Sequence, residues 1–292
     1  MQYLNSFSLA SELDELNFIT GNHYKLNMQS YSNNTYPFKI FPFKGLKRLD
    51  FEPITVIYGG NGSGKSTLLN VIAQKLEIER SAPFNNTPFF DEYLNFCKFE
   101  LTYGKKAPDG SKIITSDDVF DSLLDIRSIN EGVDRRREEL SREYFSSRKG
   151  EYLLSSIDDL AEFKRRNETK RQTASQYISS RMPRELSAMS NGETAYTYFT
   201  SQIGEGALYL LDEPENSLSA KLQGELRRFI EDSVRFYGCQ FIISTHSPFL
   251  LSMNGAKIYD LDSSPVDVRR WTELENVRIY HEFFEEHRNE FK

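Results

Sequence analysis

The chain of 292 residues is poor in cysteine and in long apolar runs. Its two cysteines, Cys97 and Cys239, lie far apart in apolar, strand-like stretches, which excludes a disulfide framework and a zinc cluster. No apolar run approaches the roughly 18 residues that a membrane span requires, and residues 1–18 lack the basic and apolar blocks of a signal peptide. We therefore expect a cytoplasmic protein that does not associate with membranes.

Positive charge is also in deficit, because 36 lysines and arginines face 43 aspartates and glutamates. A chain with a net charge of −7 does not coat nucleic acid through bulk charge, although a local basic patch could still contact it. Hydrophobic residues make up 38% of the chain, with 22 phenylalanines and 16 tyrosines, which is too apolar and aromatic for a disordered protein. The composition predicts a globular fold.

Changes in hydrophobic period divide the chain into three blocks. Residues 1–80 and 186–292 alternate strands and helices, as two halves of one α/β domain do, and residues 81–185 form an inserted hairpin with a charged helical segment. The strands expected in the two halves are residues 36–41, 54–58, 207–211 and 240–244. The helices expected there are residues 66–76, 220–237 and 272–291. In the insertion we expect a hairpin of residues 96–103 and 112–115, followed by helical sequence over residues 116–171.

The strongest motif is the glycine-rich stretch 59–67, Gly-Gly-Asn-Gly-Ser-Gly-Lys-Ser-Thr. It matches the pattern G-x-x-x-x-G-K-[ST] between a strand and a helix, so backbone N–H groups and the positive helix end can surround a phosphate. Lys65 would reach the β- and γ-phosphates of a nucleotide, and the Ser66 hydroxyl would bind Mg²⁺. The residues expected to hold the nucleotide are Gly59, Asn61, Gly62, Ser63, Gly64, Lys65, Ser66 and Thr67.

Two further apolar strands are followed by polar residues. Residues 207–211 precede Asp212 and Glu213, and residues 240–244 precede His246. In a parallel sheet these ends lie beside the phosphate loop, where Asp212 can hold Mg²⁺, Glu213 can accept a proton from water, and His246 can polarise the γ-phosphate. Taken singly, an acid pair is common at strand ends and His246 could be structural, but the glycine-rich loop favours the catalytic interpretation.

Residues 190–193, Ser-Asn-Gly-Glu, have the form of a capping box at the start of a helix. Ser190 would cap the first turn and Glu193 would bond back to the Ser190 backbone. Such a helix end attracts anions, although a cap by itself needs no further function.

The order and spacing of these motifs resemble those of the ABC-type ATPases. In that comparison residues 59–66 are the Walker A motif, 189–193 the signature, 208–212 Walker B, Glu213 the catalytic glutamate and His246 the switch histidine. The resemblance implies an α/β P-loop NTPase fold, namely an ABC-type ATPase head with an inserted, largely helical segment.

The same resemblance implies ATP and Mg²⁺ as ligands, with Lys65, Glu213 and His246 as catalytic residues. Ser66 and Asp212 would bind the metal. Because two heads face each other in that family, Ser190 and Gly192 would contact the ATP held by the other copy, which makes the protein a homodimer through composite ATP sites.

Two departures from the family pattern refine this placement. The signature is Met-Ser-Asn-Gly-Glu where transporter subunits usually have Leu-Ser-Gly-Gly-Gln, and residues 215–219 are Glu-Asn-Ser-Leu-Ser in place of Thr-Ser-Ala-Leu-Asp. The chain therefore looks like the soluble branch of SMC-like, RecF-like, OLD and Septu- or retron-type phage-defence ATPases, which work in DNA repair or antiviral defence. The alternatives are the nucleotide-binding subunit of an ABC transporter and an idle scaffold that uses ATP only to dimerise. Neither Gln172 nor Gln176 suits a Q-loop, because both lie close before the signature.

The insertion carries two kinds of charge pattern. Residues 131–142 alternate acids and bases at helical spacing, which predicts a solvated, ion-paired face. The stretch 164–184 has a basic excess that suits DNA or RNA, an acidic partner surface or simple solvation. Since no second catalytic constellation is visible, we expect ATP-driven motion to act on a separate effector protein such as a nuclease. The terminal helix, with Leu274, Val277, Tyr280 and Phe284 on one side, is expected to pack on its own domain, with a partner surface as the alternative.

Overall fold

The computed structural model describes residues 1–21, 35–148, 178 and 190–291. The chain forms two compact units, the first made of Met1–Val119 with Ser190–Lys292 and the second of Phe120–Met189. We call the first the head unit. In the described residues no helix is both long and apolar enough to cross a membrane.

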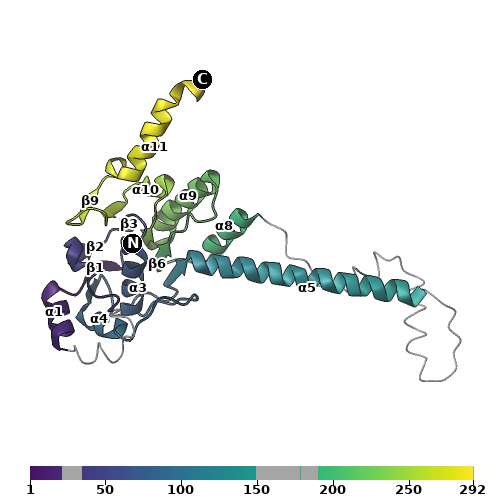
Figure 1. The fold of residues 1–292 in the computed structure, drawn as a ribbon, viewed down its shortest axis with the longest axis horizontal. Coiled ribbons are helices and arrows are strands. Elements are labelled where there is room, and N and C mark those ends of the chain that lie inside the picture. The colour runs from purple at the N-terminus through teal and green to yellow at the C-terminus, as the bar shows by residue number, and fades with distance from the viewer. Residues whose placement is uncertain (22–34, 149–177, 179–189, 292) are drawn as a thin grey trace. The chain divides into compact units, whose positions relative to one another are not determined.

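The head unit is built on a six-stranded sheet in which five neighbouring strands are parallel (Figure 1). In spatial order the strands are β5 (Lys112–Thr115), β6 (Leu208–Asp212), β7 (Gln240–Ser244), β3 (Ile54–Tyr58), β8 (Lys257–Asp260) and the antiparallel edge strand β9 (Asp267–Arg269). All residues of β3 and β7 are buried, which agrees with their nearly continuous apolar sequences. The carboxyl ends of β3, β6 and β7 therefore lie together at one edge of the sheet.

Helices pack on this sheet at the positions that local signals predict. Helix α3 (Lys65–Lys75) contacts β6, β7 and α4 (Phe90–Phe96). Helix α9 (Ala220–Tyr237) contacts β7, α8 (Asn191–Gln202) and the short α10 (Pro248–Leu251). Ser219 caps the start of α9 and Gly238, with a φ of 66°, ends it, so the predicted bounds of this helix are confirmed.

A second, antiparallel sheet has the order β2-β1-β4. Its strands are β2 (Arg48–Asp50), β1 (Leu4–Ser8) and β4 (Lys98–Leu101), and β1 is followed by helix α1 (Glu12–Gly21). The buried amide of Gln240 joins the two sheets, because its Oε1 accepts from the N–H groups of Tyr3 and Leu4 and its Nε2 donates to the Leu4 carbonyl. Nε2 also donates to the Glu52 carbonyl at 3.2 Å, so the side chain that begins β7 bonds both to the start of β1 and to the segment before β3.

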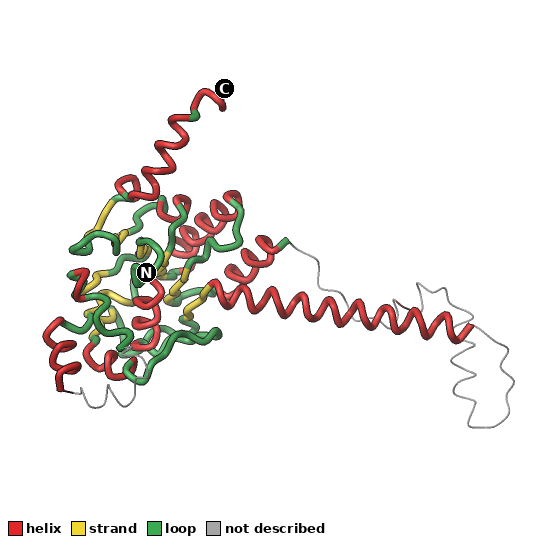
Figure 2. The backbone as a smooth tube through the Cα atoms, viewed as in Figure 1, coloured by secondary structure: helices red, strands yellow, loops and turns green. Residues whose placement is uncertain are grey.

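Most of helix α5 (Ser116–Arg148) lies in the second unit, and Figure 2 shows it as one uninterrupted helix. Exposed ion pairs run along it, between Glu131 and Arg135, between Arg136 and Glu139, and between Glu138 and Arg142. These pairs confirm the predicted solvated face. Apart from residue 178, the basic stretch 164–184 lies outside the described residues, and so do Gln172 and Gln176.

The end of the chain forms a short 3-10 turn η3 (Trp271–Glu273), helix α11 (Glu275–Glu286) and a final turn η4 (Arg288–Phe291). Only the start of the predicted apolar stripe is buried, at Leu274 and Val277, whereas Tyr280 is 47% and Phe284 is 53% exposed. The expectation that the whole stripe packs on its own domain is wrong beyond the first turn, because later turns of α11 leave the stripe open to solvent.

Other sequence-based expectations differ from the structure. The strands β4 and β5 exist, but they do not form a hairpin: β4 pairs antiparallel with β1, and β5 pairs parallel with β6. Residues 36–41 form turns instead of a strand, since prolines at both ends of this segment interrupt strand pairing. Residues 81–119, which the sequence analysis placed in the insertion, contribute β4 and β5 to the sheets of the head unit.

Candidate nucleotide-binding site

The phosphate loop joins β3 to α3 through residues 59–64, and its backbone depends on glycine. Gly62 and Gly64 have φ angles of 77° and 98°, which side chains other than glycine rarely adopt. A Cβ added to Gly59 would lie 2.6 Å from Ser63 Oγ. The loop therefore wraps a cavity of about 290 Å³, lined by Ile40, Asn61, Gly62, Ser63, Gly64, Lys65, Ser66, Thr67 and Glu213.

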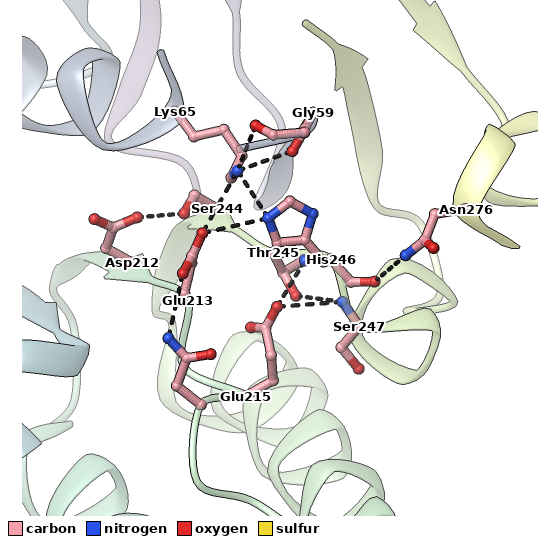
Figure 3. A network of polar contacts seen from close by, with 12 residues as sticks. Gly59, Lys65, Asp212, Glu213, Glu215, Ser244, Thr245, His246, Ser247 and Asn276 are labelled. Carbon is pink, nitrogen blue, oxygen red and sulfur yellow. Dashed lines mark hydrogen bonds and ion pairs between the residues drawn. The ribbon is translucent and has the colours of Figure 1, made fainter. Parts of the chain in front are cut away.

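Lys65 is turned into this loop and is only 4% exposed. Its ammonium donates to the carbonyl oxygens of Gly59 at 2.8 Å and Gly60 at 3.2 Å. The same Nζ lies 2.9 Å from His246 Nε2 and 3.5 Å from Glu213 Oε1, as Figure 3 shows. The loop, the residue after β6 and the histidine after β7 thus meet at one cation, as the sequence predicted for the carboxyl edge of the sheet.

Asp212 ends β6 and contacts two serine hydroxyls. Its Oδ1 accepts a hydrogen bond from Ser244 Oγ, and Ser66 at the start of α3 bonds to the same carboxylate. Burial raises the pKa of Asp212, while the hydrogen bonds from Ser244 and Ser66 and the charge of Lys65 oppose the rise. A hydroxyl and a carboxylate in contact are the oxygen donors that Mg²⁺ prefers, so this pair fits a magnesium site beside the phosphate loop.

Glu213 follows Asp212 in a left-handed conformation, with a φ of 48°. Its Oε1 lies 3.3 Å from His246 Nε2, and its Oε2 accepts from Asn216 Nδ2 at 3.2 Å. The hydrogen bond with His246 is the main cause that lowers the pKa of Glu213 to about 2, and Asn216 and the Lys65 charge add to it against the effect of burial. The carboxylate is therefore ionised at neutral pH and faces the phosphate-loop cavity.

The backbone of His246 is held from both sides. Its N–H donates to Glu215 Oε1 at 2.6 Å, and its carbonyl accepts from Asn276 Nδ2 at 3.4 Å (Figure 3). The ring lies edge to face with Tyr58, the last residue of β3, at 6.4 Å between centroids. Which of Lys65 and Glu213 bonds to Nε2 depends on the tautomer, because one ring nitrogen cannot accept from the ammonium and donate to the carboxylate together.

The sequence analysis did not assign roles to Glu215 or Asn276. A third acid directly after Asp212-Glu213-Pro214 was a visible signal for Glu215. No local sequence pattern marks Asn276, because its contact with His246 forms only when α11 packs on the rest of the head unit.

The predicted capping box at the start of α8 is confirmed. Ser190 Oγ accepts from the Glu193 N–H at 3.3 Å, and Glu193 Oε2 accepts from the Ser190 N–H at 2.9 Å. Gly192 lies close to the loop after β6, since an added Cβ would be 3.0 Å from the Ser217 carbonyl. None of residues 190–193 is among those that line the phosphate-loop cavity of the same chain.

The loop fits the phosphates of a nucleotide on its own geometry. Ser63 Oγ is buried in the loop and has no hydrogen-bond partner in the protein, so it can bond to a polar ligand. The Lys65 ammonium bonds to loop carbonyls and can turn to a phosphate oxygen within the same cavity. Both features suit a polyanionic ligand held by backbone N–H groups and one cation.

Residues 177–252, which include the helix cap, the acid pair and His246, match the family described as "AAA domain, putative AbiEii toxin, Type IV TA system". This part of the chain is similar to AAA-type ATPase domains, and it belongs to an α/β fold that carries a phosphate loop. No curated protein matches this chain at a significant level.

Solved structures resemble this chain over much of its length at low identity. The SMC head domain from Thermotoga maritima is 15% identical, with a TM-score of 0.41 over 92% of this chain and 99% of that chain. An Smc head with an extended coiled coil, bound to the C-terminal domain of ScpA from Pyrococcus furiosus, is 17% identical, with a TM-score of 0.43 over 97% and 100%. A dimeric ATP-binding cassette in a post-hydrolysis state with ADP and Pi is 13% identical, with a TM-score of 0.36 over 77% and 88%.

Proposed function

We propose that this protein hydrolyses ATP with Mg²⁺ and that two copies close on two ATP molecules. The observation that carries the proposal is the meeting of Lys65, Glu213 and His246 within 3.5 Å at the mouth of the phosphate loop. A lysine for the phosphates, a carboxylate for the attacking water and a histidine near the γ-phosphate are the parts that phosphoryl transfer to water requires.

The phosphate-binding part of the proposal assigns one task to each residue. Lys65 leaves the carbonyls of Gly59 and Gly60 and binds the β- and γ-phosphates. Ser66 and Asp212 hold Mg²⁺, which when bound neutralises charge on the phosphate oxygens. Asn61, Gly62, Ser63, Gly64 and Thr67 complete the cradle, in which the backbone N–H groups bind phosphate oxygens.

Glu213 is the proton acceptor in this proposal. In the structure, His246, Asn216 and Lys65 stabilise the ionised carboxylate of Glu213 and keep its pKa low. When Lys65 turns to the phosphates, Glu213 loses one cationic neighbour and becomes a better proton acceptor. His246 stays bonded to Glu213 and faces the terminal phosphate, so it can orient the carboxylate and respond to the charge on that phosphate.

Closure of two copies is supported by the start of α8. Ser190 is exposed and caps the start of α8, where the helix dipole favours an anion. Since residues 190–193 do not line the cavity of their own chain, we assign Ser190 and Gly192 to the nucleotide bound by the other copy. The site is then complete only in the homodimer.

The purpose of closure, in this proposal, is to act on a separate effector in defence or DNA repair. Ile279, Phe283 and Phe284 on α11 are 51–56% exposed, which gives the head unit an apolar surface for another chain. The first turn of the same helix bonds to His246 through Asn276, so this surface is connected to the nucleotide site.

The test of the ATPase is Glu213→Gln, which keeps the shape of the side chain and removes its basicity. We expect ATP binding to persist and turnover to fall by at least ~100-fold, as the loss of a general base typically costs. Glu205→Gln, at an exposed glutamate away from the loop, is the matched control and should turn over ATP like the wild type. Wild-type turnover in Glu213→Gln would place the proton acceptor on another residue.

A further inference from the structure

Glu215 links the two loops that carry Glu213 and His246. It lies on the loop after β6, and its Oε1 accepts from the N–H of His246 at 2.6 Å and from the N–H of Ser247 at 3.2 Å. Thr245 donates a further hydrogen bond to the carboxylate. All three donors belong to residues 245–247, which directly follow β7, so the Glu215 carboxylate holds this segment through two backbone N–H groups and one side-chain hydroxyl.

The backbone N–H groups that follow β7 require a hydrogen-bond acceptor. Strand β7 ends at Ser244, and the Thr245 N–H still bonds to the Ile57 carbonyl of β3, but the N–H groups of His246 and Ser247 have no partner in the sheet and must bond elsewhere. A carboxylate oxygen that accepts from two backbone N–H groups forms charge-assisted hydrogen bonds, which are stronger than neutral ones. Burial raises the pKa of Glu215, and the hydrogen bond from the His246 N–H acts most strongly against that rise.

The hydrogen bond from the His246 N–H to Glu215 also restricts the position of the imidazole ring. His246 is held at its N–H by Glu215 and at its carbonyl by Asn276, so its peptide groups have little freedom to turn. The ring then reaches Glu213 Oε1 at 3.3 Å and Lys65 Nζ at 2.9 Å. If the peptide of His246 rotates, both of these distances change together.

We propose that Glu215 is the positioning residue of His246 and that it couples the loop after β6 to the histidine. The inference rests on the proposed ATPase function, in which His246 orients Glu213. Glu215 itself does not touch the nucleotide. It keeps the imidazole at bonding distance from Glu213, and because it lies in the same loop as Glu213 and Ser217, a shift of that loop moves the histidine.

The first test is spectroscopic and does not depend on turnover. The chain has four histidines, so a protein labelled with ¹³C in the imidazole rings gives few signals, and His246→Ala identifies the signal of His246. In Glu215→Ala we expect this signal alone to shift or broaden, while Glu215→Gln, which keeps an oxygen acceptor, leaves it near its wild-type position. Glu205→Ala is the matched control for loss of an acid. An unmoved His246 signal in folded Glu215→Ala would overturn the proposal.

The second test uses kinetics. Glu215→Ala should lower kcat about 10-fold to 100-fold, the range expected when a reacting group is misplaced by about 1 Å, with little change in KM. In a His246→Ala background the same substitution should cause no further loss, because Glu215 acts through the histidine. Independent, additive losses would instead show a general structural role and overturn the proposal.

A substitute variant and the turnover of the wild type separate failure of this proposal from failure to fold and from failure of the proposed function. Should Glu215→Ala fail to fold, Glu215→Asp withdraws the carboxylate by one methylene and should give smaller changes in the same direction in both tests. Absence of ATP turnover in the wild type would refute the proposed function, and the histidine spectrum would still decide whether Glu215 positions His246.

Discussion

Replacing Glu15 by glutamine should remove a pH dependence from the stability of the head unit. Glu15 lies in α1 and is only 4% exposed. Its Oε2 accepts from the Lys39 N–H at 2.7 Å, while its Oε1 is buried without a partner. Burial is the main cause that raises the pKa of Glu15 from 4.5 to about 7, and the hydrogen bond and charge of Lys39 only partly oppose it.

The sign of the effect follows from the two protonation states. Between pH 4.5 and about 7 the folded protein keeps a proton on Glu15 that the unfolded chain releases. The free energy of unfolding therefore falls as the pH rises through this range and then levels off. Since one pKa unit corresponds to about 1.4 kcal/mol, the loss is about 3 kcal/mol.

The assay is urea unfolding followed by circular dichroism at several pH values from about 4.5 to 8. Glu15→Gln keeps an acceptor for the Lys39 N–H but cannot ionise, so relative to the wild type it should gain about 3 kcal/mol across this range. Glu205→Gln, at an exposed glutamate outside α1, is the matched control and should follow the wild type. A difference between Glu15→Gln and wild type that stays constant with pH would refute the reasoning.

The remaining predictions concern the nucleotide. Lys65→Ala should abolish ATP binding while the fold persists, because the phosphates lose their main cationic partner; equal ATP affinity by calorimetry would contradict the assignment of the loop. Ser190→Arg should leave ATP binding to each monomer intact and stop ATP-dependent dimerisation in gel filtration, because bulk and charge enter the interface. A mixture of Ser190→Arg and Lys65→Ala chains should regain ATP turnover, since one of the two composite sites then has both intact residues, and a mixture that stays inactive would exclude the trans geometry.

The elements around the phosphate loop were predictable because their signals are local. Strands β3 and β7 are continuous apolar runs, and α9 is marked at both ends by Ser219 and Gly238. The capping box at Ser190 needs only four consecutive residues. Such features depend on backbone conformation and on neighbours one turn away, so sequence alone determines them.

The pairing of strands was decided by the tertiary structure. Strand β4 was expected to join β5 across a turn, but it pairs with β1, at least 90 positions away in the chain. Neither strand contains information about its partner, because backbone hydrogen bonds are the same in every ladder. The choice depends on which faces must be buried: the residues Ile113, Ile114 and Thr115 of β5 are all buried in the central sheet beside β6.

The precise setting of the candidate site was also a matter of tertiary structure. Sequence motifs determined that Lys65, Glu213 and His246 belong to one edge of a parallel sheet. They did not determine that Glu215 and Asn276 hold the His246 backbone from two sides, since those contacts join residues 30 or more positions apart. Local sequence specifies which groups follow each strand, whereas the angles and distances between them arise only when β3, β6, β7 and α11 pack together and exclude water from their polar groups.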